Sequence, residues 1–246
     1  MNKLLVLFLV VGASCALKLP AEFEKCKRSD PNINECLKSA IQSAMPVLAK
    51  GLPEFNFDSI KPVKVPSLTI GEGTGAVHVV QNYKNLEIHN LETAKIESVK
   101  STITDDVMKI EANLYFDAVT VEADYNLDGN ILVFPIKGDG KCTLSLKNCK
   151  VTMDIEGEMF TKKEQPHVQV KDFIIKLDPG KVEFDFKNLF NGDAKLGDEM
   201  NKLLNDNWSD VFVDVKSGYE DALSAIFKNI ANLIFKKIPY NEIFEP

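Results

Sequence analysis

The longest regular pattern of apolar positions in the chain extends from Lys195 to Lys237, near the C-terminus. Large apolar residues recur there at intervals of three and four, the spacing that puts side chains on one face of an α-helix. No proline interrupts the pattern. It predicts one helix about 63 Å long, with a bend at Gly218 because glycine weakens a helix interior. The helical stripe comprises Leu196, Met200, Leu204, Trp208, Val211, Val215, Tyr219, Leu223, Ile226, Ile230 and Leu233.

A second, shorter helical pattern lies near the N-terminus, where apolar residues recur from Ile33 to Leu48 and the pattern stops at Gly51. Pro46 is expected to bend or split this helix, because proline removes an amide donor and clashes with the preceding turn. Cys26 precedes the helix and Cys36 lies within its first turns. A disulfide between these cysteines would tie the N-terminal tail to the helix and stabilise the fold by about 3 kcal/mol.

Between the two helical patterns, from Lys61 to Phe186, apolar residues alternate with polar ones, which is typical of β-strands with one buried face. No helical segment separates the strands, so they are predicted to form an antiparallel sheet. Turn residues at Asp128-Gly129-Asn130 and Gly138-Asp139-Gly140 are expected to separate strands. A third turn, Asp178-Pro179-Gly180, is predicted to join strands 168–177 and 181–186 into a hairpin.

A run of strands followed by one long helix is typical of an α+β fold. The helix is apolar over a broad arc, because Phe212, Ala222, Phe227 and Phe235 lie beside the main stripe. A flat sheet could not cover that arc, whereas a strongly twisted sheet could curl around it. We therefore expect a highly curved antiparallel sheet wrapped around the C-terminal helix. The molecule should be elongated, since a compact globule of this chain length measures only roughly 45 Å across.

The first residues have the layout of a secretory signal peptide, with Lys3 before an apolar run from Leu4 to Val11 and small residues up to Ala16. The apolar run is too short to span a bilayer. We expect residues 1–16 to be removed, residues 17–246 to form a single domain, and the protein to be secreted. Without Lys3 the net charge is 28 − 36 = −8, which argues against nucleic acid and anionic membranes as partners.

Four cysteines remain after residue 16, in a compartment that permits disulfides. Cys142 and Cys149 are seven residues apart, so on one continuous strand they would point to opposite faces and could not bond. Either a turn or bulge near Asn148 brings them together, or both stay free. We favour two free and partly buried thiols.

The sequence shows no pattern of catalytic, metal-binding or cofactor-binding residues. The glycine-rich stretch Gly71-Glu72-Gly73-Thr74-Gly75 lacks the GxGxxG spacing and precedes a strand instead of a helix. His78, His89 and His167 are far apart, the cysteines form no CxxC pair, and a GxSxG elbow is absent from the sequence. The paired acids Glu220-Asp221 are expected to lie on a solvated face. We expect no metal, no cofactor and no catalysis.

A block near the C-terminus resembles the signature of the insect takeout family, relatives of haemolymph juvenile hormone binding proteins. The resemblance covers nearly the whole mature chain and implies a curved sheet around a long helix, an N-terminal disulfide and an internal apolar tunnel. The matching residues are Asn188-Leu189-Phe190-Asn191-Gly192-Asp193, Leu196-Gly197, Asn201, Leu204-Asn205-Asp206-Asn207-Trp208, Cys26, Cys36, Pro46-Val47-Leu48, Gly51-Leu52-Pro53-Glu54 and Pro239-Tyr240 to Ile243-Phe244.

The resemblance further implies a carrier that holds a small hydrophobic ligand, either a terpenoid such as juvenile hormone or a long-chain acyl lipid. It also implies a role in circadian or feeding-related signalling. We expect a monomer without stable membrane insertion, in which one or two polar groups orient the ligand. Two alternatives stay open: a filled-core protein that docks a cell-surface receptor, and a lipid-acting hydrolase. The candidate ligand-binding residues are Phe116, Tyr125, Trp208, Phe212, Val215, Tyr219 and Leu223.

Overall fold

The computed structural model describes residues 17–246 except residues 74, 76 and 132. The expected signal peptide lies outside the described residues. Two short strands, β1 (Cys26–Lys27) and β8 (Phe244–Glu245), pair in parallel and bring the two ends of the described chain together. Within the described ranges no helix is long and apolar enough to cross a membrane.

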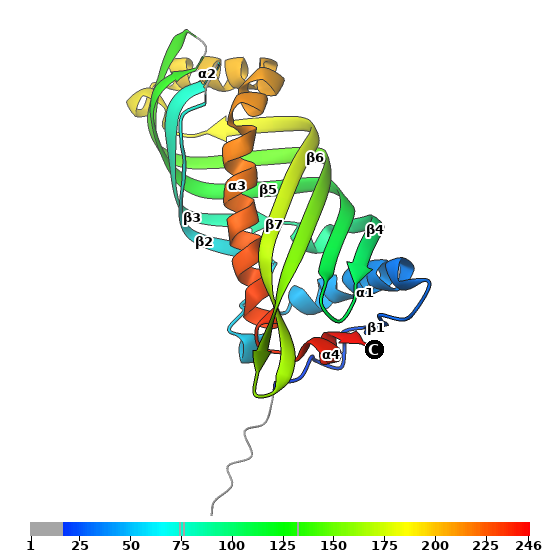
Figure 1. The fold of residues 1–246 in the computed structure, drawn as a ribbon. Helices are drawn as coiled ribbons and strands as arrows, with labels where there is room; N and C mark the ends of the chain where they lie inside the picture. Colours follow the sequence, from blue (N-terminus) through cyan, green and yellow to red (C-terminus); the bar gives the residue numbers. More distant parts are fainter. Residues whose placement is uncertain (1–16, 74, 76, 132) are drawn as a thin grey trace, which may run out of the picture.

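The main structure is a six-stranded antiparallel sheet in the order β2-β3-β5-β6-β7, in which β3 and β4 pair with different halves of β5. The sheet curves around a long helix, α3 (Trp208–Phe235), which lies along its concave face and gives the molecule an elongated shape (Figure 1). These features confirm the predicted fold class. The strands are β2 (Val63–Ile70), β3 (Val77–His89), β4 (Lys95–Ile103), β5 (Met108–Ile131), β6 (Phe134–Lys162) and β7 (Gln165–Phe186).

The N-terminal helix α1 (Ile33–Leu48) is continuous through Pro46, so this proline does not split the helix. The proline lies in the last turn, so its missing amide donor affects only the end of the helix. A disulfide joins Cys26 to Cys36, which confirms the predicted tie between the N-terminal tail and α1. Short 3-10 helices η1 (Pro53–Phe55), η2 (Leu91–Thr93) and η3 (Phe190–Gly192) and a final turn α4 (Tyr240–Ile243) complete the connections.

A line of irregular backbone crosses the three longest strands. In β5 the buried side chains change from even to odd positions between Phe116 and Val119. In β6 the same change occurs at Asn148, whose φ is 49°. The pairs Phe116↔Cys149 and Cys149↔Pro179 place both changes beside a third one in β7. Irregularities of this kind bend a strand and increase its twist, so each long strand keeps its apolar side chains on the concave side as the sheet curves.

Three predicted turns are therefore wrong, because all three segments lie inside strands. Asp178-Pro179-Gly180 is part of β7, where the proline sits on the edge of the sheet and leaves the ladder intact. Gly138-Asp139-Gly140 and Asp128-Gly129-Asn130 belong to β6 and β5. The turn between β6 and β7 is Lys163-Glu164, with φ of 50° and 62°. Asn and Gly are the usual residues for that geometry, so composition did not reveal it.

The predicted single C-terminal helix is also wrong, because α2 (Ala194–Asp206) and α3 are separate helices. The backbone leaves helical geometry at Asn207, whose Nδ2 donates to the Leu203 carbonyl at 2.8 Å. The α2 helix crosses one end of the sheet at a steep angle to α3 (Figure 1). One residue separates the helices, so the apolar spacing stays helical across the break.

Gly218 does not interrupt α3, so the predicted bend there does not break the helix. A Cβ at this position would lie 2.9 Å from Ile70 Cγ2, so glycine permits close contact with β2.

The free edge of β7 is covered by polar side chains from the two C-terminal helices. Asn232 of α3 accepts from the Val170 N–H at 2.8 Å and donates to the Val170 carbonyl at 2.9 Å. Asn201 and Asn205 of α2 bond both backbone groups of Phe186 and Phe184 in the same way. An amide side chain presents one donor and one acceptor, so it replaces a missing neighbouring strand.

Two further side chains of α3 extend this cover. Ser224 Oγ accepts from the Ile175 N–H at 2.9 Å, and Glu220 Oε1 accepts from the Leu177 N–H at 2.8 Å. The edge is thus bonded to the helices at five β7 residues. Covering an edge in this way removes a site for pairing with other chains and fixes the position of α3 along the sheet.

Replacing Asn232 with alanine should lower the free energy of unfolding by about 1–3 kcal/mol, because two backbone groups of Val170 lose their partner. Chemical denaturation would measure this change. Asn229→Ala is the matched control on an exposed position of the same helix, and its effect should stay within about 0.5 kcal/mol. Equal effects at the two positions would contradict a role for the amide in holding the helix to the edge.

Candidate functional site

The helix α3 changes character along its length. In its first turns the apolar residues Val211, Phe212 and Val215 are fully buried. From Tyr219 onward the apolar side chains pack against the core, yet each keeps part of its surface accessible. These half-buried side chains are Tyr219, Ala222, Leu223, Ile226, Phe227, Ile230, Ala231, Leu233, Ile234 and Phe235.

The concave face of the sheet has the same property. Val121 of β5 and Leu146, Met153 and Ile155 of β6 are only partly buried, although their positions in the alternation place them on the inner face. Neither β5 nor β6 is an edge strand. Filled protein cores contain few voids. Accessible apolar surface on both the helix and the middle of the facing sheet therefore indicates that side chains pack incompletely between them.

Three polar side chains meet between β3 and α3. The Tyr83 hydroxyl lies 2.9 Å from Gln81 Oε1 and 2.8 Å from the Tyr219 hydroxyl, and the Tyr219 hydroxyl donates to Gln81 Oε1 at 2.7 Å. Gln81 and Tyr83 are buried, and Tyr219 is half-buried. Burial raises the pKa of both tyrosines, so their hydroxyls stay protonated and can donate hydrogen bonds. This cluster places polar groups beside the apolar interior.

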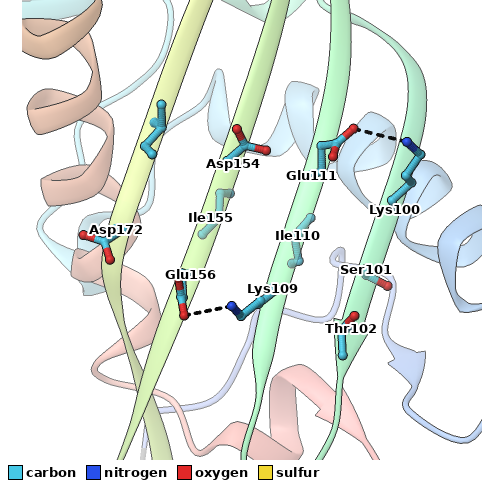
Figure 2. A pocket seen from close by; sticks show the side chains of 11 residues that line it. Lys100, Ser101, Thr102, Lys109, Ile110, Glu111, Asp154, Ile155, Glu156 and Asp172 are labelled. Atoms are coloured by element: carbon cyan, nitrogen blue, oxygen red, sulfur yellow. Dashed lines mark ion pairs between the residues drawn. The ribbon is translucent and has the colours of Figure 1, made fainter.

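Two hollows on the outside of the sheet are polar. One, of about 320 Å³, lies on the outer face of β4 to β7 (Figure 2). Four of its charged side chains form two ion pairs, Lys100 with Glu111 at 3.6 Å and Lys109 with Glu156 at 3.2 Å. The other, of about 440 Å³, is lined by residues of β6, β7 and α2, including Glu183. Charged side chains line both hollows, which does not suit an apolar ligand.

The predicted ligand-binding residues lie in different surroundings. Tyr219 and Leu223 belong to the half-buried part of α3, with Val215 one turn before them. The Tyr125 hydroxyl donates to the Lys187 carbonyl at 2.6 Å, so it is already bonded within the protein. Trp208 is half-buried, with Lys181 Nζ 5.4 Å from its ring centre. Phe116 and Phe212 are buried in the core.

Two residues of the interior were not anticipated. Glu220, expected on a solvated face, is only 3% exposed and also binds Lys176 Nζ at 2.9 Å, so that expectation is wrong. Gln81 occupies an inward position of the alternation, between the buried residues Val79 and Tyr83. A polar residue at an apolar position was the signal that could have identified it.

The remaining candidate groups do not converge. His167 of β7 is buried against Phe160. His89 lies on a different strand, β3, near Glu87 of the same strand. Over the described residues no group of three histidine, cysteine or acidic side chains could hold a metal ion. Cys142 and Cys149 are both free and buried, as favoured. The odd spacing is compatible with burial of both because the alternation changes phase between them.

A long helix enclosed by one curved antiparallel sheet, with an apolar interior, is the arrangement of takeout-type proteins. The chain belongs to the family described as Haemolymph juvenile hormone binding protein, which it matches over residues 4–245. It is therefore a member of the takeout and juvenile hormone binding protein family.

Individual relatives agree with this assignment. The crystal structure of Takeout 1 from Epiphyas postvittana is 31% identical, with a TM-score of 0.78, and covers 91% of this chain and 100% of that chain. The circadian clock-controlled protein daywake of Drosophila melanogaster is 25% identical over 232 residues, 92% of this chain and 88% of that protein. Its counterpart in Drosophila yakuba is 24% identical over 234 residues, again 92% and 88%.

Neither free thiol should react with iodoacetamide in the native protein near neutral pH. Burial raises the pKa of Cys142 to about 12 and that of Cys149 to about 11, so the reactive thiolate is scarce until the pH approaches those values. Mass spectrometry should count two alkylated cysteines only after unfolding without reductant. No alkylation after unfolding would show that the two cysteines are paired.

Proposed function

We propose that this protein is a secreted carrier that binds a small hydrophobic ligand in a tunnel between the sheet and α3, and releases it unchanged. The observation that carries this proposal is the accessible apolar surface on both walls of the interior, along α3 from Tyr219 to Phe235 and on the inner face of β5 and β6. Membership of the family described as Haemolymph juvenile hormone binding protein supports the carrier proposal.

The shape of this apolar stretch suggests a long ligand. From Tyr219 to Phe235 the helix extends about 24 Å, which suits an extended terpenoid such as juvenile hormone or a long-chain acyl lipid. Each ligand methylene buried there would contribute about 0.8 kcal/mol, so a long chain can bind well without charged contacts. Tyr219 and Leu223 would line the tunnel, while Phe116, Tyr125, Trp208, Phe212 and Val215 stay predicted ligand contacts.

The names of the relatives suggest a biological setting. The daywake proteins are named as circadian clock-controlled, and we propose a similar role in circadian or feeding-related signalling. The disulfide between Cys26 and Cys36 is consistent with an extracellular protein. We propose that the carrier acts as a monomer with residues 17–246 as its single domain, after removal of residues 1–16. It carries out no catalysis.

Replacing Leu223 with tryptophan should block the tunnel and reduce binding of a fluorescent fatty-acyl probe at least about tenfold, because the larger side chain occupies the ligand's space. The free energy of unfolding should change by less than about 1 kcal/mol, since an unfilled space accommodates the ring. Val213→Trp is the control, because Val213 is 67% exposed on the same helix and its replacement should leave binding unchanged.

A filled core would give the opposite result. Leu223→Trp would then destabilise the protein by roughly 1–3 kcal/mol through overpacking, and the wild-type protein would take up no probe. Native mass spectrometry of the protein from its natural source would add a direct readout. The carrier proposal fails if no small hydrophobic molecule co-purifies and no acyl or terpenoid probe binds.

A further inference from the structure

The cluster of Gln81, Tyr83 and Tyr219 has more hydrogen-bonding capacity than the protein uses. Its three pairwise contacts measure 2.7, 2.8 and 2.9 Å. The two hydroxyl groups carry only two hydrogens, so they can supply at most two of the three contacts when Gln81 Oε1 faces them. Gln81 Nε2 then has no acceptor among the described residues.

Turning the amide of Gln81 does not remove this surplus. Nε2 would then donate to both hydroxyl oxygens, and one tyrosine would donate to the other. The second tyrosine would keep a hydrogen without a partner, and Gln81 Oε1 would be the unused acceptor. In either orientation the cluster has a donor left over. A bound molecule can supply the missing acceptor.

The surroundings of the cluster favour an uncharged ligand group. Burial raises the pKa of both Tyr83 and Tyr219, and the nearby Cys142 raises both further. The hydroxyl of Tyr219 also raises the pKa of Tyr83. Burial keeps the Cys142 thiol protonated, with a pKa of about 12. An ionised carboxylate would have to lose its water without gaining a cationic partner, which is costly. An ester, ketone or ether oxygen needs only a donor.

The cluster also has a defined place relative to the apolar interior. Tyr219 begins the stretch of half-buried apolar residues of α3 that extends to Phe235. Val211, Phe212 and Val215, on the other side of Tyr219, are fully buried. Polar groups therefore stand at one end of the accessible apolar surface, as a ligand with one polar end and a long apolar body requires.

We propose that Gln81, Tyr83 and Tyr219 form a binding site for a neutral oxygen acceptor at one end of the ligand. The carrier thereby selects neutral amphiphiles, such as esters, over plain alkanes and over ionised fatty acids. This inference rests on the proposed carrier function and adds to it the chemical class of the ligand's polar end.

The test compares three probes by displacement of a fluorescent apolar dye: methyl dodecanoate, an alkane of the same length, and dodecanoate, which is ionised at about pH 8. The wild-type protein should bind the ester about three- to tenfold more tightly than the alkane, the gain expected from one hydrogen bond. Dodecanoate should bind more weakly than the ester.

The triple variant Gln81→Leu/Tyr83→Phe/Tyr219→Phe removes every donor of the cluster, so it should bind ester and alkane equally. Tyr115→Phe is the matched control, because its hydroxyl donates to Asn148 Oδ1 at 2.9 Å on the outer face of β5, and it should keep the wild-type preference for the ester. If the triple variant does not fold, Gln81→Leu/Tyr219→Phe makes the comparison. It leaves only the Tyr83 hydroxyl as a donor and should reduce the preference.

The outcomes separate the two proposals. If the wild-type protein binds the alkane and the ester equally, or dodecanoate as well as the ester, the acceptor site is refuted and the carrier function stands. An undiminished ester preference in the folded variants that replace Gln81 together with the tyrosines also refutes the site. If the wild-type protein binds none of the three probes and no terpenoid probe, the carrier function itself fails.

Discussion

The structure depends on how the exposed edge of β7 is satisfied. An edge strand leaves a row of backbone donors and acceptors that must bond to something, and here the partners are side chains of α2 and α3, chiefly Asn205, Asn232 and Glu220. These bonds have a fixed reach, so they hold α3 at the edge of the sheet. A helix attracted only by apolar contacts would settle into the middle of the concave face. The polar attachment thus favours an interior that side chains leave partly accessible.

The curvature of the sheet is the second requirement, and it comes from irregular backbone instead of from loops. The phase changes near Asp117, Asn148 and Pro179 lie side by side across β5, β6 and β7. Each keeps apolar side chains facing inward on both sides of the bend. Gln42 of α1 bonds the Ala94 carbonyl and the Ile96 N–H where β4 begins, so the smaller half of the sheet is covered by the same kind of contact.

The sequence block that reveals the family has a structural role. Asp193 begins α2 by accepting from the Leu196 N–H at 3.0 Å, Asn191 and Gly192 take left-handed backbone geometry, and Asn201 and Asn205 bond the edge of β7. The block therefore specifies how the helices attach to the sheet and not which ligand is bound. The buried polar residue Gln81 of the interior lies outside this block.

Local sequence by itself determined the helical stripe, the alternating strands, the curved sheet around the helix, the tie between Cys26 and Cys36 and the family, because periodicity and motif spacing are properties of neighbouring residues. Tyr219, one of the candidates to orient a ligand, stays a prediction. Only the tertiary structure decided that Pro179 lies within a strand, that Glu220 is buried, and that Gln81 meets Tyr219 across 138 residues of chain. These outcomes depend on which distant backbone lies alongside each residue, and no local pattern contains that information.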